Sequence, residues 1–381
     1  MPGLVPRVDP NGLLEYSVVF TDRALNHMSG RFQQVMLDLS RQLKAVYQAH
    51  SVAIVPGGGT YAMEAVARQL GGMGAALVLR NGWFSFRWTQ IFETMGAAAP
   101  AVLLARPTRE GPQAPFAPAP IAEVVAHIEN TRPAVVFAAH VETASGMVLP
   151  DAYLDAVSAA AHGVGALFVL DCIASGALWV DMKARGVDVL LTAPQKGWSG
   201  PAGAGVVLMS EQAAARLDTT SSTSFALDLK RWRGIMAAYE SGGHAYHATM
   251  PTDALTAFRD AIAETEALGF EAAREAQVEL GWKVRAVLAA YGCPSVAAEG
   301  FEAPGVVVSY LPRAGFSAGP ALAAHGVQVA GGVPLRCGEP ADFATFRVGL
   351  FGLDKLRDVD GTVARLEAAL AGAVGHPAAL G

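Results

Sequence analysis

Two residues of opposite charge, Asp171 and Lys196, each follow a short apolar run of the sequence. The run Ala166–Leu170 leads to Asp171, and Val187–Thr192 leads through a Pro-Gln segment to Lys196. Runs of Val, Leu and Ala of this length are typical of strands that are buried on both faces of a parallel sheet. Ligands of open α/β sheets bind beyond the carboxyl ends of the strands. Because a buried charge without a partner costs several kcal/mol, we expect the acid and the amine to share a bound partner there.

A carboxylate and a lysine at one site are what pyridoxal phosphate requires. Its aldehyde forms a Schiff base with a lysine, and its pyridinium nitrogen needs a carboxylate to keep the ring an electron sink. In this hypothesis Lys196 holds the aldehyde and later moves a proton, while Asp171 holds the ring nitrogen. An ordinary salt bridge between a loop lysine and a strand-end aspartate is the alternative. Since the residues lie 25 positions apart and each follows a predicted strand, we favour the cofactor.

The composition limits the class of protein. The chain has 381 residues, of which 52% are hydrophobic and 16% are charged. The usual charged share is about 25%, so we expect an oligomer that buries further surface. At roughly 150 residues per domain, the length predicts two or three domains. The net charge of −6 and the lack of a run rich in Lys or Arg argue against a nucleic-acid partner.

No sequence feature indicates a membrane or a secretory route. No apolar stretch reaches the roughly 18 residues of a membrane span, and Met1–Asn11 lacks a signal-peptide profile. The three cysteines, Cys172, Cys293 and Cys337, are far apart and odd in number, which is typical of a reducing cytosol. We therefore expect a cytoplasmic protein without a membrane partner.

A glycine-rich turn follows the strand predicted at Val52–Val55. Gly57, Gly58 and Gly59 come directly before Thr60 and a helix-forming run. Backbone N–H groups and the helix dipole at such a junction can bind a phosphate. The turn matches neither a P-loop nor GxGxxG, so a plain tight turn is at least as compatible with the sequence.

Further candidate side chains lie near other predicted strand ends. Four aromatic residues lie within positions 83–88; one of them could stack on a planar cofactor, and the others are expected in the core or in a dimer contact. The hydroxyl of Thr143 follows the strand predicted at Ala134–Ala139 and could bond a cofactor oxygen. Arg347 lies inside the apolar run TFRVGLFG and needs a carboxylate, from the protein or from a substrate. Sequence pattern alone favours neither source.

The spacing of His244 and His247, an HxxH, is poor evidence of metal binding. No cysteine or acid lies close to them in the sequence, and zinc sites need such ligands. We therefore expect no metal site.

The alternation of strand and helix patterns predicts the domain organisation. We expect an N-terminal arm over residues 1–25, a large domain over residues 26–255 and a small C-terminal domain over residues 256–381. Elements are expected towards the C-terminus as helices Thr252–Gly269, Phe270–Tyr291 and Asp354–Leu370, and as strands Gly305–Tyr310, Gly326–Val329 and Thr345–Leu350.

The order of these motifs resembles the class V aminotransferases among the fold-type I pyridoxal phosphate enzymes, in particular the alanine–glyoxylate and serine–pyruvate aminotransferases. The resemblance runs from about residue 30 to 373, and its most specific parts are VLDCIASG, APQKG, YHATMP and FRVGLFG. It implies an α/β fold with a large cofactor-binding domain, whose mostly parallel sheet is flanked by helices, and a smaller C-terminal α+β domain.

The resemblance also implies roles for individual residues. Lys196 and Asp171 are the expected catalytic residues, and both bind the cofactor. The other residues expected to bind the cofactor are Gly58, Gly59, Thr60, Phe84, Thr143, Gln195, Tyr246 and Thr249. Phe84 aligns with the aromatic that stacks on the ring, and Arg347 with the arginine that binds the substrate carboxylate. Tyr246 and Thr249 match a pair that reaches the phosphate of the neighbouring subunit, which implies a homodimer.

The resemblance implies transamination from a small amino acid, alanine or serine, to a small 2-oxo acid, glyoxylate or pyruvate. The N-terminal stretch lacks the Gly-Pro-rich segment that usually lines the substrate pocket, so the substrate stays open. One alternative is a phosphoserine or aminophosphonate transaminase, whose phosphoryl group needs further cations. The candidates for that role are Arg23, Arg87, His244 and His247.

Two further alternatives change the reaction. A cysteine desulfurase needs a nucleophilic cysteine on a loop before the late arginine, and Cys337 lies 10 positions before Arg347. A Rossmann-type dehydrogenase or a nucleotide-binding module would need a GxGxxG loop, which the sequence lacks. The pair formed by Asp171 and Lys196 argues against this last class.

Overall fold

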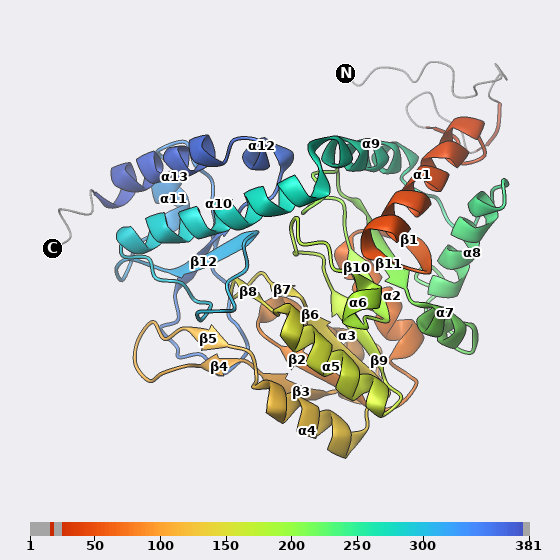
Figure 1. Ribbon diagram of the computed structural model, residues 1–381, viewed down its shortest axis with the longest axis horizontal. Coiled ribbons are helices and arrows are strands. Elements are labelled where there is room, and N and C mark those ends of the chain that lie inside the picture. Colours follow the sequence, from red (N-terminus) through yellow and green to blue (C-terminus); the bar gives the residue numbers. More distant parts are fainter. Residues whose placement is uncertain (1–15, 19–24, 376–381) are drawn as a thin grey trace.

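A seven-stranded sheet forms the centre of the larger part of the molecule (Figure 1). Its strands, in spatial order, are β1 (Ser51–Gly57), β11 (Gly203–Met209), β10 (Val189–Thr192), β9 (Leu167–Asp171), β6 (Val135–Ala139), β2 (Ala76–Arg80) and β3 (Ala101–Leu104). The pairs from β10 to β3 are parallel, and β11 is antiparallel to both of its neighbours. The prediction of a mostly parallel sheet is confirmed.

The structure is a computed structural model that describes residues 16–18 and 25–375. The arm predicted over residues 1–25 lies almost wholly outside the described residues, as does Arg23. The division into domains at residue 255 stays a prediction.

The two strands that lead to Asp171 and Lys196 were both predicted. All residues of β9 and β10 are buried, and the strands pair in parallel with Leu191 opposite Asp171. On its other side Asp171 pairs with Ala139, the last residue of β6. The carboxyl ends of β6, β9 and β10 therefore meet at one edge, where the segments that follow them come together.

Helices pack on both faces of this sheet. They are α1 (Gly30–Tyr47), α2 (Gly59–Leu70), α3 (Trp83–Thr94), α4 (Ile121–Thr131), α5 (Asp151–Gly163), α6 (Met182–Arg185), α7 (Glu211–Asp218), α8 (Leu229–Glu240) and α9 (Thr252–Leu268). In Figure 1, α4, α5 and α6 lie in front of the sheet, and α2 and α3 lie behind it. Ser210 is the N-cap of α7, and its Oγ accepts a hydrogen bond from Ala213 N–H.

The C-terminal part is built around a three-stranded antiparallel sheet under α10 (Phe270–Ala290). Its strands are β12 (Val306–Tyr310), β14 (Thr345–Gly349) and β13 (Ala330–Gly331), and its further helices are α11 (Ala318–Ala323), α12 (Leu353–Leu356) and α13 (Val359–Val374). Two small hairpins, β4 (Arg106–Pro107) with β5 (Phe116–Ala117) and β7 (Val141–Glu142) with β8 (Met147–Val148), complete the chain.

Two predictions for the C-terminal part were wrong. The strand expected at Gly326–Val329 is a turn, because Gly326 has a φ of 79° and bonds back to the Ala323 carbonyl to end α11. The single helix expected at Asp354–Leu370 is two helices. The carboxylate of Asp358 accepts a hydrogen bond from Gly361 N–H and so begins α13 as a new helix.

The sequence prediction also missed α3, α4 and α8. The aromatic segment that begins α3 was not assigned to a helix. Its N-cap residue is Gly82, which has no side chain that could indicate the start of a helix in the sequence. The Pro-rich segment 111–120 is not simply an exposed connector, because it contains Phe116, of which only 1% is exposed.

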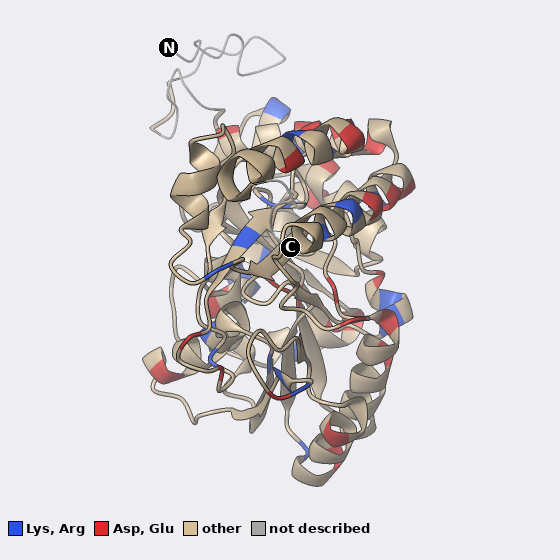
Figure 2. Cartoon of the chain, turned by 90° about the vertical axis from the view of Figure 1, so that its left-hand side faces the viewer, with Lys and Arg blue, Asp and Glu red and all other residues tan. Residues whose placement is uncertain are grey.

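Few charged residues of the described part of the chain are buried in the hydrophobic core. Figure 2 shows acidic and basic residues interspersed along the outer helices of the side that it presents. Among the described residues, no helix combines the length and the apolar character needed to cross a membrane.

Candidate active site

One pocket at the carboxyl edge of the sheet collects most of the predicted site residues. Its volume is about 150 Å³. It is lined by Gly59, Thr60, Met63, Phe84, Arg87, Val141, Thr143, Asp171, Ile173, Ala174, Gln195 and Lys196. These residues follow β1, β2, β6, β9 and β10, so the position agrees with the rule for ligand sites of open α/β sheets.

Asp171, the last residue of β9, presents a buried carboxyl group to this pocket. Only 6% of the residue is exposed, and Ile173 N–H donates to its Oδ1 over 2.9 Å. Burial raises the pKa of Asp171 to about 7, and the charge of Glu142 adds to this rise. The Ile173 hydrogen bond and the charge of Arg87 oppose it. A carboxyl group in this setting needs a cationic partner to be fully ionised at neutral pH.

Lys196 lies in a loop that the surrounding chain holds tightly. A Cβ on Gly197 would come within 2.0 Å of the Gly176 carbonyl oxygen, so only glycine fits beside the lysine. Two positions further on, Trp198 is 1% exposed and packs against the rings of Tyr47 and Trp179. The loop is therefore anchored directly behind Lys196, and its side chain is free to reach the pocket.

The amine of Lys196 is biased towards its neutral form. Burial lowers the pKa of Lys196, and the guanidinium of Arg347 lowers it further. Its Nζ also lies 5.5 Å from the centre of the Phe351 ring. A lysine with a lowered pKa is suited to nucleophilic attack on a carbonyl and to moving protons.

The glycine turn before α2 leaves backbone open towards the pocket. A Cβ on Gly59 would meet Ile173 Cδ1 at 2.6 Å, whereas a Cβ on Gly58 would have only Gln195 Nε2 within 4 Å, at 3.9 Å. Gly58 is the N-cap of α2 and has no side-chain cap, so the first N–H groups of the helix have no side-chain acceptor at that position. Thr60 Oγ1 accepts a hydrogen bond of 2.8 Å from Arg87 Nη1.

Phe84 lies in the first turn of α3, and two guanidiniums lie close to its ring. The Cζ atom of Arg87 is 5.2 Å from the centre of the Phe84 ring, and that of Arg347 is 5.7 Å from it. Arg347 comes from β14, where its Nε donates to the Gly331 carbonyl over 2.9 Å. Burial lowers the pKa of Arg347, and the charge of Glu142 opposes this shift.

Four predicted residues do not line this pocket. Gly58 and Arg347 lie next to residues that line it, Gly59 and Phe84, whereas Tyr246 and Thr249 lie elsewhere in the chain. Tyr246 and Thr249 are exposed, and their hydroxyl oxygens lie 3.4 Å apart. Neither lines the pocket.

Of the candidates for binding a substrate phosphoryl group, only Arg87 lies at the pocket among the described residues. Arg87 lines the pocket, but the ring of His244 packs against His27, and that of His247 packs against Phe225 and Trp232. No group of three or more His, Cys, Asp or Glu among the described residues could hold a metal ion.

The thiol that a desulfurase would need is unsuited to that role. Cys337 is 7% exposed, and its Sγ donates to the Arg80 carbonyl over 3.4 Å. Burial raises the pKa of Cys337 to about 12, with the charges of Glu142 and Glu339 adding to the rise. A nucleophilic cysteine needs a low thiol pKa and exposure, so this environment argues against a desulfurase.

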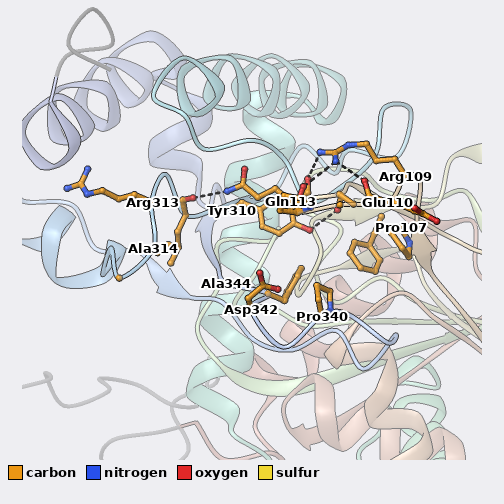
Figure 3. Close-up of a pocket in the computed structure, with 17 residues that line it drawn as sticks. Pro107, Arg109, Glu110, Gln113, Tyr310, Arg313, Ala314, Pro340, Asp342 and Ala344 are labelled. Atoms are coloured by element: carbon orange, nitrogen blue, oxygen red, sulfur yellow. Dashed lines mark hydrogen bonds between the residues drawn. The ribbon is translucent and has the colours of Figure 1, made fainter. Parts of the chain in front are cut away.

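A second cavity, of about 600 Å³, lies between the β4–β5 hairpin and the C-terminal part (Figure 3). None of the predicted site residues lines it. Three of its polar side chains have partners within the protein: Arg109 donates to backbone carbonyls, Gln113 Nε2 donates to Leu311 O, and the hydroxyl of Tyr310 donates to Ala114 O. We therefore place the chemistry in the smaller pocket that holds Asp171 and Lys196.

The residues of that smaller pocket fit pyridoxal phosphate. Gln195 Oε1 is buried and has no hydrogen-bond partner among the described residues. No cationic side chain of residues 16–18 and 25–375 forms an ion pair with the buried Asp171 carboxyl, and a pyridinium N–H would supply such a partner. The open space at Gly58 offers room for a phosphate at the N-terminus of α2, where helix N–H groups are available as donors.

Sequence reasoning missed two residues of the site. Arg87 was considered only as a phosphoryl ligand, although it follows Phe84 by three positions, the spacing of neighbours on one face of a helix. Glu142, the residue directly before Thr143, was assigned no role from the sequence.

Comparisons with known proteins agree with this site. The family described as aminotransferase class-V matches residues 13–307. A 2-aminoethylphosphonate–pyruvate transaminase of Paraburkholderia phymatum is 30% identical over 344 residues, which cover 87% of this chain and 84% of that protein. A protein named soluble hydrogenase, small subunit, from a Synechococcus strain is 27% identical over 367 residues, which cover 91% of this chain and 87% of that one.

Solved structures share the fold. An alanine–glyoxylate aminotransferase from Nostoc sp. has a TM-score of 0.75 and 23% identity, and the match covers 91% of this chain and 89% of that one. A pyridoxamine–pyruvate aminotransferase from Mesorhizobium loti has a TM-score of 0.76 and 18% identity, with 99% and 94% covered. The fold-type I architecture inferred from the motifs is confirmed. The chain belongs to the class V aminotransferases, enzymes that work with pyridoxal phosphate.

Proposed function

We propose that the chain transfers the amino group of a small amino acid, alanine or serine, to a small 2-oxo acid, glyoxylate or pyruvate. The observation that carries this proposal is the position of Arg347. Its guanidinium lies beside the Phe84 ring, with Cζ 5.7 Å from the ring centre, and close enough to Lys196 to lower the pKa of that amine. A guanidinium there can bind an α-carboxylate while the neighbouring lysine acts on the α-carbon.

The pocket residues divide the work of holding pyridoxal phosphate. Lys196 would bind the aldehyde, Asp171 the ring nitrogen, and Phe84 the ring face. The N–H groups of Gly58, Gly59 and Thr60 would bind the phosphate with Gln195 as a further donor, and Thr143 would bond a cofactor oxygen. When bound, the cofactor supplies an electron sink next to the substrate α-carbon.

The remaining chemistry belongs to the side chains. Arg347 orients the donor by its carboxylate, so that the α-hydrogen faces Lys196. Burial and Arg347 lower the pKa of Lys196, so its Nζ can take up the proton from the substrate α-carbon. The same amine would then deliver this proton to the cofactor carbon on the other side of the amino nitrogen. The Asp171 carboxylate would accept a hydrogen bond from the protonated ring nitrogen and so keep that nitrogen positively charged and electron-withdrawing.

The test is a half-reaction with single donors. Purified protein loaded with pyridoxal phosphate is mixed with alanine, serine, phosphoserine or 2-aminoethylphosphonate, and the visible absorbance of the cofactor is followed. We expect alanine or serine to abolish the band and pyruvate or glyoxylate to restore it. A band that responds only to a phosphorus-containing donor would reject the proposed substrate and keep the cofactor.

A second donor, 2-aminoethylphosphonate, is favoured by the Paraburkholderia phymatum relative and by Arg87. The two guanidiniums that lie close to Phe84, those of Arg87 and Arg347, could together neutralise a phosphonate. We rank this donor second, since Arg87 already donates to Thr60 Oγ1, at the turn assigned to the cofactor phosphate.

We also propose a homodimer whose subunits complete each other's sites. Tyr246 and Thr249 form an exposed pair outside the pocket of their own chain, and the family resemblance assigns this pair to the phosphate of the neighbouring subunit. The location that we propose is the cytoplasm, since the three cysteines are all buried and unpaired. Fractionation of the source cells tests this location.

A further inference from the structure

A buried carboxylate lies directly beneath the first turn of α3. Glu142 is fully buried, and four donors surround its two oxygens. Oε1 accepts from Phe84 N–H over 3.2 Å and from Ala144 N–H over 3.0 Å. Oε2 accepts from Ser85 N–H over 2.8 Å and from Ser85 Oγ over 2.7 Å. Four donors and no acceptor match the hydrogen-bonding capacity of a carboxylate.

These hydrogen bonds supply the cap that α3 lacks in its own sequence. The first N–H groups of a helix have no partner within the helix, and a negative charge at that end is favourable. The N-cap of α3 is Gly82, which has no side chain. A Cβ there would meet Glu142 Cγ at 2.7 Å, so the glycine leaves the space that the carboxylate occupies.

The same carboxylate fixes two groups of the pocket. Phe84 donates its own backbone N–H to Glu142, so the orientation of its ring depends on that contact. Thr143 follows Glu142 in the sequence, and Glu142 Oε1 closes the turn around it through Ala144 N–H. Glu142 itself does not line the pocket.

We propose that Glu142 is a positioning residue, whose four hydrogen bonds hold the Phe84 ring and the Thr143 turn in the geometry that binds pyridoxal phosphate. This inference rests on the proposed function, because it assigns the cofactor ring to the face of Phe84. It adds a residue that touches neither cofactor nor substrate but sets the affinity for the cofactor.

The first test is Glu142→Gln, read by the dissociation constant of pyridoxal phosphate. An amide has one acceptor and one donor group, so at least one of the backbone N–H groups loses its partner. We expect cofactor binding, measured by fluorescence titration of the cofactor-free protein, to weaken about 10- to 100-fold. The visible circular dichroism of the bound cofactor, which reports the ring orientation, should change as well.

Asp188→Asn is the matched control. Asp188 is also a buried carboxylate, and it accepts hydrogen bonds from Phe168 N–H and Ser210 Oγ at the opposite end of the sheet. Both variants should melt at a lower temperature than the wild type, but Asp188→Asn should change cofactor affinity less than about threefold. Equal weakening in the two variants would show that Glu142 serves stability alone and would overturn the inference.

A double-mutant cycle with Phe84→Ala tests the route of the effect. If Glu142 acts through Phe84, adding Glu142→Gln to Phe84→Ala should weaken binding less than about threefold further. Additive losses both in this cycle and in the same cycle with Thr143→Ala would overturn the inference. If Glu142→Gln does not fold, Ser85→Ala removes one of the four hydrogen bonds and should weaken binding about threefold to tenfold. A wild-type protein that binds no pyridoxal phosphate would instead reject the proposed function.

Discussion

At the scale of single residues, the site depends on two ionisable groups that burial drives towards their neutral forms. Burial raises the pKa of Asp171 and lowers that of Lys196. Both shifts are unfavourable for a charged pair and favourable for a site that will receive a cationic ring nitrogen and an aldehyde. Because Asp171 is buried, its ionisation lowers the free energy of unfolding of the cofactor-free protein, and this effect can be measured.

The pKa of Asp171, about 7 when folded against a model value of 3.8, gives a signed prediction for stability. A raised pKa contributes stability that is fully present below pH 3.8 and is lost as the pH rises through 7. In Asp171→Asn this loss is absent. We expect the unfolding free energy of the cofactor-free variant to gain on the wild type between pH 5 and pH 8 by about 2–4 kcal/mol.

Denaturant unfolding of both proteins at these two pH values makes the measurement. A difference between variant and wild type that does not change with pH would contradict the buried, partly protonated state of Asp171.

Arg347→Ala should weaken donor binding with little effect on cofactor binding. Losing a charge-assisted contact to a carboxylate typically costs 1.5–3 kcal/mol, so kcat/KM for the donor should fall about 10- to 150-fold. The dissociation constant of pyridoxal phosphate should stay within about threefold of the wild-type value, which serves as the control. Steady-state kinetics at fixed 2-oxo acid gives the first quantity, and an unchanged KM for the donor would remove Arg347 from this role.

Residues of this site differ in how far the sequence could identify them. Asp171 and Lys196 follow buried strands, and the rule for strand ends was enough to bring them together. The roles of Arg87 and Glu142 could be recognised only once the position of α3 was known. Two of the hydrogen-bond donors to Glu142 are backbone N–H groups of α3 that lie 57 and 58 positions away in the sequence. Hydrogen bonds between residues so far apart in the chain cannot be inferred from the local sequence pattern.

At the scale of elements, the junction between β1 and α2 makes a separable prediction for its two glycines. A Cβ on Gly59 would collide with Ile173 at 2.6 Å, whereas one on Gly58 would have its nearest neighbour at 3.9 Å. Gly59→Ala should therefore destabilise the cofactor-free protein by about 1–3 kcal/mol. Gly58→Ala should leave its stability nearly unchanged but weaken pyridoxal phosphate binding, because the methyl group occupies space assigned to the phosphate.

Thermal unfolding with and without cofactor separates the two effects. If Gly58→Ala binds pyridoxal phosphate as tightly as the wild type, the phosphate does not lie on this turn.

Elements were predicted well where periodicity and burial agree. The fully buried strands β9 and β10 have continuous apolar sequences, which are typical of buried strands. Helices α9 and α10 have long amphipathic patterns. The first turn of α3 could not be predicted, since its stabilising charge comes from β7. The break between α12 and α13 was missed because the local hydrogen bond of Asp358 outweighed a continuous apolar pattern.

At the scale of the whole molecule, the proposed dimer predicts complementation between inactive subunits. We expect Lys196→Ala to be inactive and a Tyr246→Ala/Thr249→Ala variant to be impaired. In a mixed dimer, one site combines an intact Lys196 with the intact loop of the other subunit. If subunits exchange at random, about a quarter of all sites are complete, and about a quarter of wild-type activity should return.

Mixing after dissociation and reassociation, with each variant alone as control, makes this measurement. A mixture no more active than its components would show that Tyr246 and Thr249 do not act across a subunit boundary.

The central claim is that Lys196 carries pyridoxal phosphate. The most direct measurement is borohydride reduction of the cofactor-loaded protein, followed by proteolysis and mass spectrometry of the labelled peptide. We predict that the pyridoxyl group is found on Lys196 and that Lys196→Ala carries no label at the other lysines. A label on a different lysine, or none on a protein saturated with pyridoxal phosphate, would contradict the account.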